Sequence, residues 1–149
     1  MFLHLRNIPP RLATGGYVLH TGLEKWNGTE EQAKGVHAMA AGAFPFLAKV
    51  PPATFLRALA AAEIGVGAAL LIPLVPNKVA GAALTAFAGG LVTMYLRTPS
   101  LHQEGSIWPT RAGTGVSKDV WMLGIGLGLT ADAAFDKEAR RPPEAACRG

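Results

Sequence analysis

Between Lys78 and Arg97 the chain runs for 18 residues, 79–96, without one charged side chain. About 20 residues of α-helix cross the hydrocarbon core of a bilayer, which is roughly 30 Å thick. A stretch of this length between two cations therefore has the pattern of a membrane span. The feature restricts this part of the chain to a membrane-spanning helix or to a helix buried in the core of a soluble protein.

Three other stretches have the same character but carry charged side chains. They are residues 11–26, whose uncharged core is short, residues 54–73, which contain Glu63, and residues 118–135, with Asp132 near the end. Half of all residues are hydrophobic, mostly Ala, Gly and Leu, and only 16% are charged, which favours helices over strands. Together with residues 78–97, these stretches predict an all-α, four-helix transmembrane bundle. The alternative is an Ala-rich soluble bundle in which three of the four stretches are buried helices.

The distribution of cations and aromatic residues predicts an orientation for this bundle. Cations are equally numerous on the two sides of the four spans, but the segment before the first span carries Arg6 and Arg11 and no acid. Because cationic N-terminal segments favour the inner side, we expect both termini in the cytoplasm. Four aromatic residues would then form a belt at the outer ends of the spans: Trp26, Tyr95, Trp108 and Trp121.

Capping residues indicate where helices begin. Thr29 followed by Gln32 is a capping box, and we interpret residues 30–44 as a short amphipathic helix at the outer interface between the first two spans. The alternative is a surface helix packed on a soluble core. Asn77 and Ser117 are the expected N-caps of the third and fourth spans.

The end of the chain differs in composition from the spans. We expect a disordered tail at residues 136–149 after a single domain at 1–135. The one cysteine, Cys147, lies in this tail, which excludes an intrachain disulfide and a four-cysteine metal site. No metal site is predicted, and a redox role would depend on a cofactor or a partner.

Glu63 is the charged residue expected deepest in the membrane. Helical rise places it about 15 Å from the outer end of its span. Charged groups at this depth face the bundle interior and pair. Glu63 therefore has two interpretations: it binds a cofactor headgroup or relays protons, or it belongs to a structural ion pair that holds the bundle together.

Small residues predict close helix packing in the first and fourth spans. A stripe on one face of the first span should point inward: Arg11, Gly15, Val18, Gly22 and Lys25. Gly124 and Gly128 have the spacing of a packing motif in the fourth span.

His20 lies on the side of the first span opposite this stripe. It matches Glu63 in depth, but its face is wrong for pairing, which makes it a weak site candidate. Haem is disfavoured because two axial ligands are the rule and no second histidine lies within a span.

Charged residues gather at the helix ends. Four of them should lie at the outer ends, as a salt-bridge network or as a site for an anion or a quinone headgroup: Arg57, Arg97, Lys118 and Asp119. Asp132, near the inner end of the fourth span, is expected to pair with Arg11.

Several short motifs, in order, resemble the DoxX family of small bacterial membrane proteins over residues 9–135, in a form similar to its actinobacterial branch. The motifs are Arg11-Leu-x-x-Gly15, Gly22-Leu-Glu-Lys25, Glu63-x-x-x-Gly67-x-x-Leu70-Leu71-x-Pro73, Lys118-Asp119, Tyr95-Leu-Arg-Thr-Pro-Ser-Leu-His102, Gly105-Ser-Ile107 and Pro109-Thr110. The resemblance implies a four-helix bundle in a bacterial plasma membrane. It also implies a link to quinone oxidoreductases or thiol homeostasis through soluble or membrane redox partners. The positions that it marks are Arg11, Lys25, Glu63, Lys118 and Asp119.

Three functional hypotheses follow. The first is a redox-associated, quinone-linked membrane subunit or anchor, at most one subunit of an oxidoreductase complex. The second is a non-enzymatic membrane scaffold or assembly partner, and the third is a small transporter. A nucleic-acid partner is excluded, because the cations behind the net charge of +4 flank apolar spans instead of forming a basic stripe with stacking aromatics. Lipid is the expected environment, and the sequence does not predict an oligomeric state.

Overall fold

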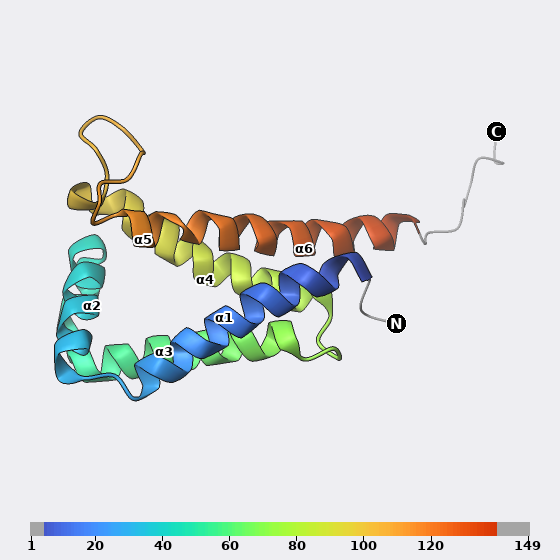
Figure 1. Cartoon of the computed structure of the whole chain (residues 1–149), viewed down its shortest axis with the longest axis horizontal. Helices are drawn as coiled ribbons and strands as arrows, with labels where there is room; N and C mark the ends of the chain where they lie inside the picture. The colour runs from blue at the N-terminus through green and yellow to red at the C-terminus, as the bar shows by residue number, and fades with distance from the viewer. Residues whose placement is uncertain (1–4, 140–149) are drawn as a thin grey trace.

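The computed structural model describes residues 5–139, and within that range the chain is helical throughout, with no strand. The elements are η1 (Leu5–Asn7), α1 (Ile8–Trp26), α2 (Glu30–Ala43), η2 (Pro45–Lys49), α3 (Pro52–Leu71), α4 (Asn77–Arg97), η3 (Pro99–Leu101), α5 (Thr114–Ser117) and α6 (Asp119–Ala139). The long helices α1, α3, α4 and α6 alternate in direction, and α2 lies across one end of them (Figure 1). Both ends of the described chain lie at the opposite end of the bundle (Figure 1).

Helix boundaries agree with the expectations in most places. The Thr29 hydroxyl accepts the backbone N–H of Gln32 at 3.2 Å, which confirms the N-cap of α2. Two predicted caps are wrong: Ser117 lies inside the short helix α5, and Asn77 is the first residue of α4 with its side chain bonded elsewhere.

The expected tail also begins later than predicted. Helix α6 continues to Ala139, past the predicted end of the domain at residue 135. The rest of the predicted tail, 140–149, lies outside the described residues and includes Cys147.

Glycines bring α1 and α3 into backbone contact. A Cβ atom on Gly67 would lie 2.6 Å from the backbone nitrogen of Leu19. A Cβ on Gly15 would lie 2.8 Å from Cβ of Leu70, and one on Gly22 would lie 2.9 Å from the backbone nitrogen of Ile64. The inward orientation of the small-residue stripe is therefore confirmed, and α1 and α3 form one closely packed pair.

This contact predicts a sharp difference between two glycines of α3. Gly67→Ala should lower the free energy of unfolding by about 1–3 kcal/mol, because the added methyl group meets backbone that cannot move aside. The matched control is Gly65→Ala, because a Cβ at Gly65 meets nothing within 4 Å. Thermal unfolding of the purified variants measures the difference, and equal stability of the two would contradict the packing described.

Helices α4 and α6 form the second pair, also through glycine. A Cβ on Gly126 would lie 2.7 Å from the backbone nitrogen of Thr85, and one on Gly81 would lie 2.9 Å from the carbonyl oxygen of Gly126. The predicted motif of Gly124 and Gly128 is wrong, because both residues are exposed and have open space where a Cβ would be.

The surface of the bundle is apolar. Helices α3 and α4 are long and apolar enough to cross a membrane, yet only 33% and 28% of their apolar windows are buried in the protein. Among residues 5–135, sixteen large hydrophobic side chains are exposed, for example Leu12, Val79 and Phe135. Two helices of this length and hydropathy, together with these exposed side chains, are consistent with association with a membrane.

The aromatic residues follow the expected belt in part. Trp26, Trp108 and Trp121 are all more than half exposed and belong to segments at the end of the bundle that carries α2. Tyr95 does not belong to this set. It is 5% exposed, and its hydroxyl donates a hydrogen bond to the carbonyl oxygen of Ile107 at 2.7 Å, which ties the 102–112 loop to α4.

Candidate functional site

A cavity of about 480 Å³ lies where the two helix pairs meet α2. We call it the α2-end cavity. Its walls come from all five longer helices and from α5, and they are mainly apolar, with contributions from Met39, Phe87 and Met94. Its charged lining residues are Lys25, Glu63 and Asp119.

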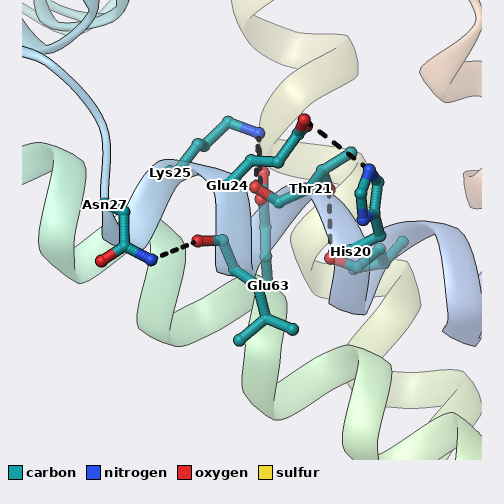
Figure 2. Close-up of polar contacts among 8 residues, drawn as sticks. His20, Thr21, Glu24, Lys25, Asn27 and Glu63 are labelled. Carbon is teal, nitrogen blue, oxygen red and sulfur yellow. Dashed lines mark hydrogen bonds and ion pairs between the residues drawn. The ribbon is translucent and has the colours of Figure 1, made fainter.

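Lys25 and Glu63 form an ion pair across the interface of α1 and α3. The Lys25 Nζ donates to Oε2 of Glu63 at 3.0 Å (Figure 2), and the Glu63 side chain is only 7% exposed. Lys25 is the last basic residue of α1, and Gly22, one turn earlier, lets α1 approach α3 closely enough for the ammonium to reach Glu63. A buried carboxylate thus has its counter-ion on the neighbouring helix.

Asp119 brings a second carboxylate to the same cavity. It is the first residue of α6 and lies within electrostatic range of both Lys25 and Glu63. Among residues 5–135, no side chain donates a hydrogen bond to its carboxylate or forms an ion pair with it. The cluster therefore holds two carboxyl groups and one ammonium, and one of its acceptors has no partner in the described protein.

Arg11 lies away from the cavity, at the other end of α3. It is 2% exposed, and its guanidinium donates five hydrogen bonds of 2.7–3.0 Å. The acceptors are the carbonyl oxygens of Ala69, Leu70, Ile72 and Val75 and the side-chain oxygen of Asn77. Since a guanidinium has five N–H groups, Arg11 has none left for a ligand. It caps the C-terminus of α3 and fixes the turn to α4.

Asp132 does not pair with Arg11 as predicted. Its carboxylate accepts a hydrogen bond from Nε of Arg6 at 2.8 Å and another from Nδ2 of Asn7 at 2.6 Å. These contacts join the start of α1 to α6 at the end of the bundle opposite α2. The prediction was wrong because the guanidinium of Arg11 turns toward α3 instead.

The remaining candidates lie outside the cavity. His20 is exposed, with Nε2 3.6 Å from the Glu24 carboxylate, and this pair is separate from Lys25 and Glu63 (Figure 2). Arg97 lies 5.2 Å from the ring centroid of Phe44, as a cation–π contact between α4 and the end of α2. Arg57 and Lys118 are exposed. In the part of the chain described, the predicted salt-bridge network of Arg57, Arg97, Lys118 and Asp119 does not form.

Several lining residues were not anticipated from the sequence. Helix α2 contributes Gln32, Val36 and Met39, so the predicted interfacial helix also forms one wall of the site. Three of the four methionines line the cavity: Met39, Met94 and Met122. Methionine adapts its shape to different ligands, and this accumulation is the signal that sequence reasoning could have used.

A site of this kind suits a small lipophilic molecule with a polar head. The apolar walls can hold a ring or a chain, the ammonium of Lys25 can donate to a carbonyl oxygen, and the carboxylate of Asp119 can accept from a hydroxyl or ammonium group. Within the described residues, no group of three or more His, Cys, Asp or Glu side chains could hold a metal ion. No protein-family model, no curated protein and no solved structure matches this chain.

Proposed function

We propose that this chain is a multi-pass membrane protein related to the DoxX family, and that it holds a quinone-class molecule in the α2-end cavity for a redox partner. The observation that carries the proposal is the cavity itself, which is apolar, about 480 Å³ in volume, and has Lys25, Glu63 and Asp119 on its wall. In this view the protein is a quinone-linked subunit or anchor, and electrons are exchanged by a partner protein.

The four-helix transmembrane arrangement is part of the proposal. Helices α3 and α4 have the length and hydropathy of spans. Helices α1 and α6 carry more charge, but Arg11, Lys25 and Asp132 are engaged inside the protein or between helices. Their outward faces remain apolar through residues such as Tyr17 and Leu127, and lipid can surround them.

The orientation and location follow from the same arrangement. With four spans, both termini lie on one side, which the cations Arg6 and Arg11 mark as the cytoplasmic side. The α2-end cavity then opens in the outer leaflet of a bacterial plasma membrane, at the level of the exposed tryptophans.

A quinone fits the residues that line the cavity. Phe55 and Phe87 offer aromatic surface to a ring, and the methionines offer adaptable contacts. Lys25 makes one good hydrogen bond, to Glu63, so it can donate another to a ring carbonyl. Bound quinone supplies reversible redox chemistry, and the residues of this chain bind and orient it.

The test is ligand binding in lipid nanodiscs. We expect quinone to co-purify with the protein and decylbenzoquinone to bind it. Glu63→Gln should weaken this binding about tenfold, because Lys25 loses the carboxylate that positions its ammonium. Glu24→Gln is the matched control, since Glu24 is an exposed carboxylate outside the cavity. The proposal would be contradicted if the wild-type protein binds no quinone and cells that carry Glu63→Gln show no phenotype under oxidant stress.

A non-enzymatic scaffold is the second candidate, and specific contacts favour it. The guanidinium of Arg11 joins α1 to α3 and α4, and the contact of Arg6 with Asp132 joins the start of the described chain to α6. If Lys25 and Glu63 do the same, Glu63→Gln lowers protein abundance, and a partner protein co-purifies without any bound quinone. The same nanodisc preparations therefore distinguish the two functions.

A further inference from the structure

A second depression adjoins the α2-end cavity, between α1 and α6. It has a volume of about 310 Å³. On the α1 side it is lined by Ala13, Thr14 and Tyr17, and on the side of α5 and α6 by Gly115, Lys118, Asp119, Trp121, Met122 and Ile125. We call it the α1–α6 groove. Tyr17, Asp119 and Met122 line both spaces, so the groove leads directly to the charged cluster.

The architecture explains why an opening lies at this position. Helix α1 packs on α3 and helix α4 packs on α6, each through glycines in backbone contact. Helices α1 and α6 are joined by Arg6 and Asn7 with Asp132 at one end, and they diverge toward α2 (Figure 1). The groove occupies the space that this divergence leaves.

If the helices span a membrane, the groove lies at the depth of the lipid chains. Ala13 lies 13 residues before the end of α1, which is roughly 20 Å of helix rise. The residues on both sides of the groove, such as Leu12 and Trp121, are large, apolar and exposed. Molecules dissolved in lipid meet such an apolar surface directly.

Charge indicates which ligands the groove admits. The two charged residues that line the groove are Lys118 and Asp119, and among residues 5–135 no side chain donates a hydrogen bond to the Asp119 carboxylate. A ligand hydroxyl group complements both residues, because it donates to the Asp119 carboxylate and its oxygen accepts from the Lys118 ammonium, whereas a group with only acceptors leaves Asp119 without a donor.

We infer that ligands of the α2-end cavity enter sideways from the bilayer through the α1–α6 groove, and that they are lipophilic molecules whose head donates a hydrogen bond to Asp119. This inference rests on the proposed function and names the entrance and the ligand class of the same site. Among quinone-class molecules it selects the hydroquinone, which has two hydroxyl donors, over the quinone, which has none.

The entrance is tested by obstructing it without changing the cavity. Ala13 is exposed and lines the groove but not the cavity, so Ala13→Phe fills the groove alone. Leu12→Phe is the matched control, because Leu12 is exposed on the same turn and lines neither space. Gly115→Phe obstructs the groove from the α5 side, where a Cβ meets nothing within 4 Å.

Fluorine NMR of a fluorinated decylhydroquinone in nanodiscs measures both its affinity and its exchange rate. We expect Ala13→Phe and Gly115→Phe to slow association and dissociation about tenfold and to leave the dissociation constant unchanged. Leu12→Phe should exchange like the wild type. If the wild type binds the ligand and both obstructed variants exchange it at the wild-type rate, the groove is not the entrance, and the proposed function is unaffected. A wild type that binds neither decylhydroquinone nor decylbenzoquinone would overturn the proposed function as well.

A second binding experiment tests the class of ligand. Asp119→Asn should weaken the binding of decylhydroquinone about tenfold more than that of decylbenzoquinone, because only the hydroquinone donates to the carboxylate. Decylammonium, a donor of different shape, should bind the wild type and lose affinity in Asp119→Asn as well. An equal effect of Asp119→Asn on decylhydroquinone and decylbenzoquinone would overturn the selection for donors.

Discussion

Replacing Arg11 with lysine is expected to lower the free energy of unfolding by about 3–5 kcal/mol, the range seen when a buried charged group loses its partners. An ammonium has three donors and no planar fork, so it cannot reach the five acceptors that Arg11 now satisfies. The carbonyl oxygens at the end of α3 would then be left without donors. A buried carbonyl oxygen that loses its donor costs the desolvation free energy of that group.

The measurement is thermal or denaturant unfolding in detergent, with Arg57→Lys as control. Arg57 also belongs to a long helix but is exposed, so its conservative replacement should change stability by less than about 0.5 kcal/mol. Arg11 would instead belong to a ligand site if Arg11→Lys unfolded like the wild type and lost quinone binding. That result would contradict the structural role described above.

Much of the architecture could be predicted from the spacing of charges. The uncharged stretch before Arg97 became α4, and the capping box at Thr29 became the start of α2. Both signals are local, because the length of a helix and its N-terminal cap are determined by consecutive residues. The end of α6 was misplaced because charged residues after 135 continue a helix as well as they begin a tail.

The partners of the charged residues could not be predicted in the same way. Arg11 binds mostly backbone carbonyl groups, which carry no signature in the sequence, and so Asp132 was wrongly assigned to it. Asp119 lines the cavity as the first residue of α6, directly after the short helix α5, which the sequence did not predict. Which side chains pair across helices depends on the rotation and tilt of each helix, and the periodicity of the sequence does not determine these.

Lys25→Met is expected to destabilise the protein more than Glu63→Gln does. Loss of Lys25 leaves the carboxylates of Glu63 and Asp119 in the cavity without the cation that pairs with Glu63, at a cost of roughly 3 kcal/mol. Loss of the Glu63 carboxylate leaves Lys25 with Asp119, which lies within its electrostatic range, so the charges still balance. We expect Glu63→Gln to lower the free energy of unfolding by about 1 kcal/mol, because the hydrogen bond from Lys25 to a carboxylate is replaced by a weaker one to an amide oxygen.

The double variant Lys25→Met with Glu63→Gln decides whether charge balance is the cause. It retains Asp119 as a single carboxylate and should recover part of the stability lost in Lys25→Met, with a coupling free energy of about 1–2 kcal/mol. Unfolding of the four proteins of this cycle in the same detergent gives that coupling. Additive losses would mean that Lys25 and Glu63 act independently and that the 3.0 Å contact contributes nothing to stability. A positive coupling, together with weakened quinone binding in Glu63→Gln, would mean that one ion pair both joins α1 to α3 and positions the ammonium for the ligand.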